Sequence, residues 1–449
     1  MIASPRQPDH QEHLTELPDG ENKALPIAAI YGANGAGKSN LVKALSYLQK
    51  LVITGTEPKK STGRTPFLLN KEGQSQPSEF SIQFVVSGEI YSFGCRVRDA
   101  VIDAEWLVLV VNGSEQIVYE RITDSNGDVR IEPGPVLTEN ALADSVKVIA
   151  LAKVGVLENQ LFLHAVLSNL KEQDQGSVLS GVLRWFSKLV IVEPHSQFQR
   201  LAGWLDQEPS RLRFADDFLR KAATGVDRLI IGTVALENGV LGNFAPELQS
   251  KIEAMGPGDV ASIPQANGTE MIVEKGEGTV VKLRTIKAAH TSTEGKPVEF
   301  PFSEESDGTQ RITHLLPALY AICEGDAVFV IDEIDRSLHP LLAKWFVRSF
   351  LKEGQGKGGQ LIFTTHDTAF LDLSLLRRDE IWFADKLQNA GATDLYSLSD
   401  YKVRTDLRID KAYLEGRFNA VPPIGNEFPE WVGKIMNELH PQDTLTEAV

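Results

Sequence analysis

Blocks of apolar and polar residues follow one another along the chain, and the spacing inside each block predicts its secondary structure. Residues 24–31 (ALPIAAIY) are almost continuously apolar, which is typical of a strand buried on both faces. Residues 38–51 instead repeat apolar side chains at helical spacing. Near the other end, 327–332 (AVFVID) and 360–366 (QLIFTTH) predict two more buried strands, with a helix over 340–351 between them. We therefore expect both ends of the chain to fold together as one α/β core.

The middle of the chain carries two different patterns. Residues 80–122 alternate between apolar and polar positions and predict a β-rich segment. Residues 138–172 are nearly continuously apolar and predict helix. Arg377 and Arg378 are expected in a solvated turn. The expected organisation is a flexible segment at 1–22, a first part of the core with the β-rich subdomain at 23–135, a helical insert at 136–235, a second part of the core at 236–425, and a tail at 426–449.

Composition narrows the functional classes. The 449 residues include 45 Lys and Arg against 61 Asp and Glu, which gives a formal charge of −16. A general basic surface for DNA is therefore not expected, although a local basic groove stays open. No apolar run approaches the roughly 20 residues of a membrane span, and the polar N-terminus has no secretory apolar segment. Because Cys95 and Cys323 make no disulfide framework, we expect a cytoplasmic protein without a membrane partner.

Residues 32–39 (GANGAGKS) match the pattern G-x-x-x-x-G-K-[ST] in full, between the expected strand and the expected helix. In such a loop, consecutive backbone N–H groups and a helix N-terminus face the phosphates. Gly35 and Gly37 permit backbone conformations that a Cβ would obstruct. Lys38 would contact the β- and γ-phosphates, and the Ser39 hydroxyl would bind Mg²⁺. The loop therefore predicts nucleotide binding.

Two further strands end in polar residues that suit the same chemistry. Ligands bind outside the carboxyl ends of strands in an open α/β sheet. Asp332, Glu333 and His366 are therefore expected at the edge where the phosphates lie. Asp332 would hold Mg²⁺ through water, and Glu333 would act as general base toward the attacking water. His366 would contact the γ-phosphate and hold that water.

The stretch 305–311 (ESDGTQR) precedes a predicted helix and forms a second candidate phosphate site. Ser306 or Asp307 could cap that helix, and Gly308 would expose backbone N–H groups. A plain helix cap explains the same spacing. Since one P-loop already holds a triphosphate, a second site is useful if it contacts the nucleotide of a second subunit.

Together, these motifs resemble those of ABC-type ATPase heads of the RecF, SMC and Rad50 group, for which GANGAGKSN is typical. The stretches ESDGTQRITHLLPAL, VFVIDEIDRSLHPLL, TTHDTAFLD and RRDEIWFADK resemble more closely the bacterial AAA15/RloA-type ATPases. The resemblance implies an α/β fold, an ABC-type P-loop head with a mixed β-sheet core, helices, and β-rich and compact helical inserts. Family members usually begin with a strand pair before the P-loop strand, and residues 1–22 match it poorly.

The resemblance also implies a role for each motif position. Nucleotide contacts are implied for Asn34, Gly35, Gly37, Lys38, Ser39 and Asn40 and, on the nucleotide of the opposing subunit, for Ser306, Gly308 and Gln310. Mg²⁺ contacts are implied for Ser39 and Asp332, and catalysis for Glu333 and His366. Asp335, Ser337 and Leu338 would form the D-loop, and Gln83 is a candidate for the Q-loop.

For such a family the resemblance implies an ATP hydrolase that assembles with itself, as a head-to-tail dimer or a higher homo-oligomer, in phage defence. Its effector would be a neighbouring protein such as a Toprim-type or RloB-type nuclease. The chain after His366 contains no Glu followed by D-x-D, so we expect no nuclease within it. The compact helical insert argues against the long coiled coils of SMC and Rad50 proteins.

Two alternatives stay open. A RecF-like clamp would bind duplex DNA in an ATP-dependent way, with a steep dependence on salt. A transporter ATPase is disfavoured, because the stretch S-D-G-T-Q differs from the L-S-G-G-Q of transporters. Only the resemblance implies that the nucleotide is ATP rather than GTP.

Overall fold

The computed structural model describes residues 1–435 with gaps. The residues left out are 112, 139–142, 170–177, 195–197, 199–200, 236–245, 258, 265–269, 276–278, 326, 388–389, 403–406, 422–434 and 436–449. The expected tail at 426–449 therefore lies, apart from residue 435, outside the described residues.

Six strands form the central sheet in the order β18-β17-β3-β16-β15-β9. They are β3 (Ile27–Tyr31), β9 (Leu189–Val192), β15 (Val328–Ile331), β16 (Gln360–Thr364), β17 (Ile381–Lys386) and β18 (Thr393–Ser397). All neighbouring pairs are parallel except β17 and β18. Every residue of β3 is buried, as its continuous apolar run predicts. Strands from both ends of the chain thus share one sheet, and the predicted α/β fold class is confirmed.

Helices cover both faces of this sheet. They include α1 (Lys38–Ile53), α6 (Val178–Lys188), α10 (Asp307–Glu324), α11 (Pro340–Glu353) and α12 (Ile409–Leu414). Successive strand residues point to opposite faces. On one face Val42 of α1 packs with Leu189 and Val330, and on the other face Phe329 and Phe363 pack in the core that contains α10 and α11. The carboxyl ends of the parallel strands are therefore held between rigid layers.

A second sheet, of five antiparallel strands, contains the predicted β-rich segment. Its strands are β4 (Ser78–Val86), β5 (Glu89–Val97), β6 (Ile102–Val111), β7 (Ser114–Thr123) and β8 (Val129–Pro133), with helices α2 (Lys71–Ser75), α3 (Pro135–Thr138), α4 (Ala143–Val154) and α5 (Phe162–Asn169) nearby. The stretch 138–172 is therefore not one helix. Gly155 has φ 85° directly after α4. At the start of α5 the buried Glu105 carboxylate accepts the N–H groups of Phe162 and Leu163, at 2.6 and 3.0 Å.

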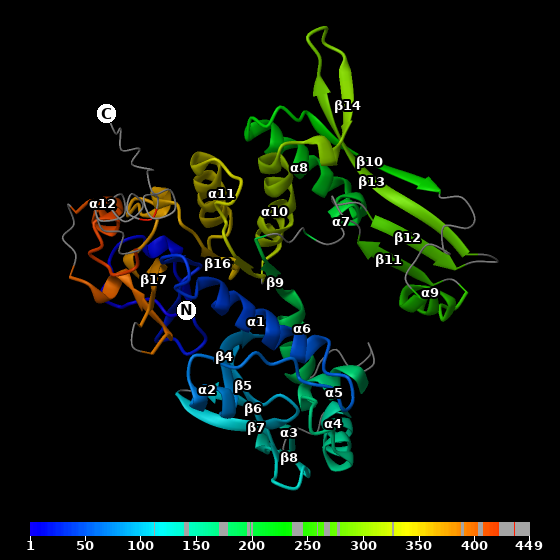
Figure 1. Cartoon of the computed structure of the whole chain (residues 1–449), viewed down its shortest axis with the longest axis vertical. Coiled ribbons are helices and arrows are strands. Elements are labelled where there is room, and N and C mark those ends of the chain that lie inside the picture. The colour runs from blue at the N-terminus through cyan, green and yellow to red at the C-terminus, as the bar shows by residue number, and fades with distance from the viewer. Residues whose placement is uncertain are drawn as a thin grey trace, which may run out of the picture.

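A third sheet lies at the other end of the molecule (Figure 1). It contains β10 (Arg228–Ala235), β11 (Val260–Pro264), β12 (Glu270–Lys275), β13 (Thr279–Thr291) and β14 (Pro297–Pro301), next to α7 (Leu201–Gln207), α8 (Pro209–Lys221) and α9 (Pro246–Glu253). The expected helical insert at 136–235 is interrupted by β9, which joins the central sheet beside β15. The pattern of residues 181–194 (GVLRWFSKLVIVEP) predicts the end of a helix that runs into a strand, and α6 and β9 confirm it. The local pattern does not indicate that this strand pairs with β15.

The N-terminal segment, expected to be flexible, instead packs against the chain near β17. It contains the 3₁₀ turn η1 (Gln11–His13) and a short antiparallel pair, β1 (Thr15–Glu16) with β2 (Lys23–Ala24). Arg377 is almost fully buried, pairs with Asp379 at 2.9 Å, and donates to the carbonyl groups of Asp9 and Gln7. The prediction of a solvated turn at Arg377 is thus wrong, because the first residues of the chain cover it.

Short 3₁₀ turns complete the described elements. They are η5 (Phe302–Glu304), η6 (Thr368–Phe370), η7 (Arg378–Glu380) and η8 (Leu398–Asp400). Within the described part of the chain, each helix is too short or too polar to cross a lipid bilayer.

Candidate functional site

The glycine-rich loop joins the end of β3 to the start of α1, at the carboxyl edge of the central sheet. Gly35 and Gly37 have φ values of 79° and 104°, a region that residues with a Cβ rarely adopt. The loop is closed by a hydrogen bond from the Ala36 N–H to the Ala33 carbonyl, at 3.1 Å. Gly37 precedes α1 without a side-chain cap, so the first N–H groups of the helix stay available to an anion.

Lys38 is buried inside this loop. Its Nζ donates to the carbonyl oxygens of Gly32 and Ala33, at 2.7 and 3.3 Å. Burial lowers the pKa of Lys38, while the charges of Asp332 and Glu333 act in the opposite direction. The ammonium group is therefore held at the loop and lies in the electrostatic field of the acidic pair.

Asp332 and Glu333 directly follow β15, and Thr364 at the end of β16 fixes both residues. The Thr364 hydroxyl donates to Asp332 Oδ1 and accepts the Glu333 N–H, the latter at 2.8 Å. Asp332 is buried, whereas the Glu333 side chain is 37% exposed. Glu333 has φ 51°, a left-handed conformation that is uncommon outside glycine. The backbone thus turns sharply at the residue expected to act as general base, and its carboxylate stays accessible to water.

His366 lies two residues beyond β16 and is exposed. Its pKa is lowered, first by partial burial and then by the charge of Lys38, while Asp335 and Glu333 oppose that shift. The charges of Asp332, Glu333 and Asp335 affect the pKa of Lys38 as well as that of His366. Lys38, Asp332, Glu333 and His366 therefore lie near one another at one edge of the sheet. The Asn34, Ser39 and Asn40 side chains lie partly or fully exposed on the loop and the first turn of α1.

The candidate signature residues lie at the start of α10 and contact other groups. The Ser306 hydroxyl accepts the Thr309 N–H at 3.1 Å, which is the helix cap that the spacing predicts. Gln310 Nε2 donates to the Glu305 carbonyl at 2.8 Å. A Cβ placed on Gly308 would lie 2.8 Å from the Ser337 carbonyl, so the signature stretch packs directly on the expected D-loop.

Arg311, one turn into α10, is a residue for which the sequence motifs predict no role. Its guanidinium is buried and donates to the carbonyl groups of Asp332 and Glu333, at 3.3 and 3.5 Å. Its Nε and Nη1 atoms have no hydrogen-bond partner among the described residues. An arginine on the same helix as the signature residues thus touches the backbone of both acids. The sequence feature that could have indicated this buried arginine is a charged residue at the start of an apolar helical stretch (RITHLLPAL).

The β17–β18 hairpin also contacts the P-loop, which the sequence did not indicate. The Thr393 hydroxyl donates to the Ala36 carbonyl at 2.7 Å. A Cβ on Gly37 would lie 1.9 Å from that hydroxyl, and a Cβ on Gly32 would lie 2.5 Å from the Ala384 carbonyl. Close packing therefore requires glycine at both positions, and at Gly37 the backbone conformation requires it as well.

Gln83 does not join this site. It lies on β4 and lines a cavity of about 980 Å³ together with Lys188, Val328 and Gln360. Val328 and Gln360 are the first residues of β15 and β16, whereas the nucleotide loop follows the last residue of β3. The Q-loop candidate is thus at the opposite edge of the sheet, because the β-rich sheet packs below the amino ends of the strands.

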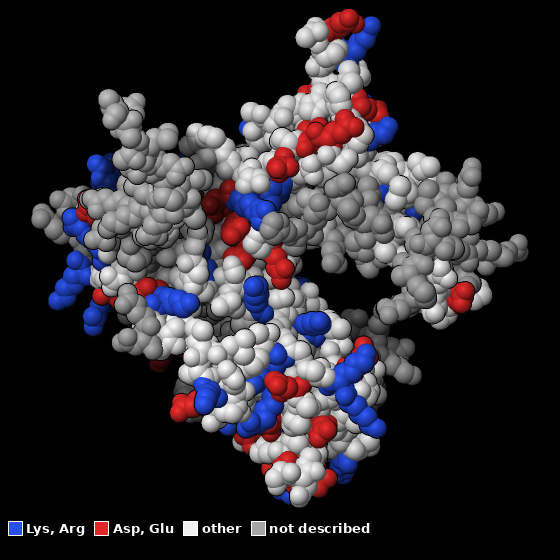
Figure 2. Space-filling model, viewed as in Figure 1, with Lys and Arg blue, Asp and Glu red and all other residues white. Residues whose placement is uncertain are grey.

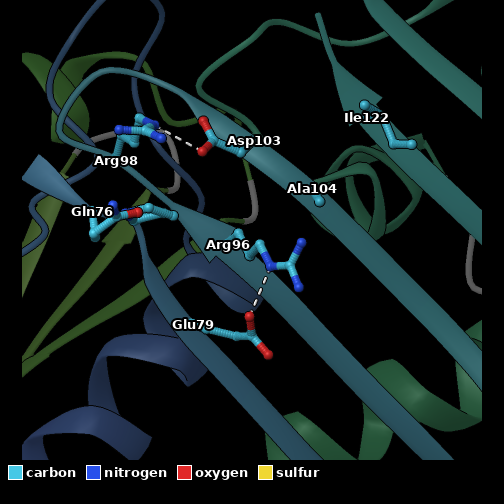
Figure 3. Close-up of a pocket in the computed structure, with 8 residues that line it drawn as sticks. Gln76, Glu79, Arg96, Arg98, Asp103, Ala104 and Ile122 are labelled. Atoms are coloured by element: carbon cyan, nitrogen blue, oxygen red, sulfur yellow. Dashed lines mark hydrogen bonds and ion pairs between the residues drawn. The ribbon is translucent and has the colours of Figure 1, made fainter.

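A shallow hollow of about 580 Å³ on the antiparallel sheet contains two arginines (Figure 3). Arg96 pairs with Glu79 at 2.7 Å, and Arg98 pairs with Asp103 at 2.8 Å. Each arginine is already neutralised, so the hollow is not an anion site. Over the described residues of the face drawn in Figure 2, acidic and basic side chains are likewise interspersed.

The residues at the sheet edge fit a nucleotide with a divalent cation. The loop offers backbone N–H groups and Lys38 to phosphate, and the Asp335 Oδ1 atom is buried without a described partner. A serine hydroxyl and a carboxylate, from Ser39 and Asp332, are oxygen donors of the kind that Mg²⁺ prefers. The chemistry of this edge is therefore that of nucleotide phosphates.

The central sheet, with a P-loop after β3 and paired acids after β15, has the α/β fold of a P-loop ATPase. The chain belongs to the AAA_21 family, described as "AAA domain, putative AbiEii toxin, Type IV TA system", whose model matches residues 27–126 and 191–372. No curated protein gives a significant match to the sequence.

Several solved structures are similar to the chain at low identity. The SmcHead bound to the C-winged helix domain of ScpA is 16% identical over 83% of this chain and 90% of that chain, with a TM-score of 0.36. The SMC head domain from Thermotoga maritima is 13% identical over 86% and 96%, with a TM-score of 0.30. A Smc head domain bound to the C-terminal domain of ScpA derived from Pyrococcus furiosus is 14% identical over 90% and 98%, with a TM-score of 0.34. At such scores no residue of this chain takes its role from them.

Proposed function

We propose that the chain binds ATP with Mg²⁺ between two copies of itself, hydrolyses the ATP slowly, and uses its nucleotide state to hold or release an effector protein in anti-phage defence. One observation carries this proposal. Lys38, Glu333 and His366 share one edge of the sheet, whereas Ser306 and Gly308 contact the D-loop and the helix cap. One chain supplies the P-loop, the base and the histidine at this edge, and its own signature stretch makes other contacts. A second copy of the chain completes the site by supplying its signature stretch.

Each residue has a defined task in this proposal. The P-loop amides and Lys38 bind the phosphates, and Ser39 and Asp332 hold Mg²⁺. When bound, Mg²⁺ neutralises charge on the phosphates. Glu333 takes a proton from the attacking water, and His366 orients that water near the γ-phosphate. Ser306, Gly308 and Gln310 bind the nucleotide of the other subunit.

The effector part of the proposal rests on the resemblance to the AAA15/RloA-type ATPases. A Toprim-type or RloB-type nuclease encoded nearby is the expected partner. The family description, which names a toxin system, is compatible with a defence role. A RecF-like DNA clamp is the alternative, and the charge of −16 disfavours it.

The test uses a tagged Glu333→Gln protein, expressed with its neighbouring genes and purified with ATP and Mg²⁺. We would measure the mass of the complex and identify what accompanies it. A defined oligomer with a second protein is the expected result, and Lys38→Ala serves as the control that cannot hold nucleotide. A nucleotide-dependent dimer that carries DNA and no protein would favour the clamp. A monomer in saturating ATP would contradict the shared site.

A further inference from the structure

Two histidines and a glutamate of the N-terminal segment meet at the turn η1. One nitrogen of His10, one nitrogen of His13 and one carboxylate oxygen of Glu12 all lie within 4.8 Å of one another. The two imidazole rings are stacked with their centroids 4.8 Å apart. His10 directly precedes η1 in a left-handed conformation, with φ 48° and ψ 50°, and its carbonyl accepts the His13 N–H at 3.1 Å. The backbone therefore places the three donors side by side.

The hydrogen bonds of His10 determine which of its nitrogens carries a proton. Its Nε2 lies 2.9 Å from the Leu373 carbonyl oxygen, which can only accept, so Nε2 is the donor. In a neutral ring Nδ1 then has a lone pair. That lone pair faces the Glu12 carboxylate oxygen at 3.1 Å. Two electron-rich atoms at this distance require a cation between them, which is either a proton or a metal ion.

His13 is oriented in the way that metal-binding histidines are. Its Nδ1 lies 3.0 and 3.2 Å from the two carboxylate oxygens of Glu380. Glu380 is fully buried and also accepts the Arg377 N–H at 2.8 Å, so its position is fixed. A carboxylate that accepts one ring N–H sets the tautomer and leaves the other nitrogen free to bind a metal. His10, with Leu373 behind it, has the equivalent arrangement.

We propose that His10, Glu12 and His13 form a binding site for a divalent transition metal ion, with Zn²⁺ as the fitting example. Two imidazoles and one carboxylate are a donor set that zinc accepts, with water at the remaining position. Each ligand atom lies about 2.0–2.1 Å from a bound zinc ion. Ligand atoms that share one zinc ion are therefore closer to one another than 4.8 Å, so the turn contracts on binding. Glu12 is free to move, since its side chain is 57% exposed, whereas His13 is held by Glu380.

The site joins two distant parts of the chain. His10 contacts Leu373 and His13 contacts Glu380, and both partners belong to the stretch that links His366 to β17. The neighbouring Ser4 N–H donates to Asp379 at 2.7 Å. A bound ion would therefore fasten the N-terminal segment to the stretch behind the nucleotide edge, and it would do so without touching the P-loop residues.

The experiment uses the full-length protein, stripped of metal by a chelator and titrated with Zn²⁺ in the absence of nucleotide. We expect a single equivalent to bind, and we expect Glu12→Gln to weaken that binding at least about tenfold. Glu12 is exposed, so this change leaves the fold intact. His339→Gln, an exposed histidine that caps α11, is the matched control and should leave the affinity unchanged.

A second readout does not depend on a variant. Trypsin cleaves after the exposed Arg6, and bound Zn²⁺ should slow that cleavage several-fold in the natural sequence but not in Glu12→Gln. The proposal is overturned if no equivalent of Zn²⁺ binds, or if Glu12→Gln binds it as well as the natural protein does. In either case His10 and Glu12 form an ordinary ion pair through a proton. Neither outcome bears on the proposed ATPase function.

Discussion

At the scale of single residues, the candidate site depends on a few side chains whose surroundings fix their state. Thr364 holds Asp332 and the backbone of Glu333 at the end of β15. The Glu333 carboxylate lies 3.8 Å from Nη1 of Arg336, and the Glu333 side chain is 37% exposed. A carboxylate that is positioned through its backbone but open at its oxygens suits a base that must accept a proton from water.

The first prediction concerns this base. Glu333→Gln should lower ATP turnover by at least about 100-fold, because a positioned general base contributes on that order, while ATP binding is retained. Phosphate release and nucleotide binding, measured on the same preparation, separate the two effects. Glu353→Gln, an exposed glutamate at the end of α11, is the control. Equal turnover in both variants would remove Glu333 from the proposed mechanism.

His314 supports a prediction of pH dependence. It is buried on α10, and its Nδ1 accepts the Phe198 N–H at 3.1 Å. Burial, and then the charge of Arg311, lower the pKa of His314 from 6.5 to about 4. Between these values the unfolded chain binds a proton that the folded chain does not. Acidification from pH 6.5 to pH 4 therefore lowers the free energy of unfolding, by at most about 1.4 kcal/mol per pH unit.

The measurement is urea unfolding at several pH values for the natural protein and for His314→Gln. The variant should lose this part of the pH dependence, and above pH 6.5 the difference between the two proteins should become constant. His339→Gln changes an exposed histidine that caps α11, so it should lower the free energy of unfolding but keep the fall in stability between pH 6.5 and pH 4 that His314 produces. A variant whose curve stays parallel to that of the natural protein from pH 6.5 down to pH 4 would show that His314 does not titrate as described.

At the scale of elements, α10 connects the signature stretch to the paired acids. Its first turn carries Ser306 and Gly308, and Arg311 then reaches the carbonyl groups of Asp332 and Glu333. Gly308 meanwhile packs on the Ser337 carbonyl of the D-loop. A displacement of α10 would thus reach both acids through a single side chain.

Arg311→Met tests this connection. Replacing a buried and incompletely paired charge by an apolar side chain of similar length is often neutral or stabilising, so the melting temperature should hold or rise. ATP turnover should fall by about 10-fold to 100-fold, because the acids lose a positioning contact. Arg213→Met, at an exposed position on α8, is the control for both readouts. Unchanged turnover in a stable Arg311→Met protein would assign the arginine to packing alone.

At the scale of the whole molecule, the three larger sheets occupy different positions relative to the nucleotide edge. The central sheet carries the nucleotide edge, the antiparallel sheet packs toward the amino ends of its strands, and the third sheet lies beyond α10 (Figure 1). The signature stretch and the P-loop have no described contact with each other, which motivates a site shared between two copies. A site shared between two copies predicts that two different inactive variants restore activity when mixed, whereas a site within one chain does not.

Two defective variants should rescue each other when mixed. Lys38→Ala removes the P-loop charge and Ser306→Arg blocks the signature stretch, and each protein alone should be nearly inactive. In a symmetric dimer with shared sites, a mixed dimer has one site with both defects and one with neither. An equal mixture should therefore recover roughly a quarter of the natural turnover. A mixture that stays inactive, although mass measurements show mixed dimers, would indicate that each chain completes its own site.

The patterns of the sequence alone determined much of this protein. A continuous apolar run predicted β3, helical spacing predicted α1 and α11, and glycine spacing with a following lysine predicted the P-loop. These features are local: each depends on residues within a few positions of one another, so periodicity and motif spacing record them directly. The acids after β15 and the histidine after β16 could be placed together for a related reason, since carboxyl ends of parallel strands share one edge.

Only the tertiary structure decided the features that pair distant residues. Arg377 is buried because residues 7 and 9 cover it, Thr393 touches Ala36 across the central sheet, and Arg311 reaches the acids of another element. The break between α4 and α5 and the placement of β9 also depend on neighbours far along the chain, Glu105 and β15. Local spacing carries no information on such pairs, because the free energy that selects them comes from burial and hydrogen bonding formed only when the whole chain has folded.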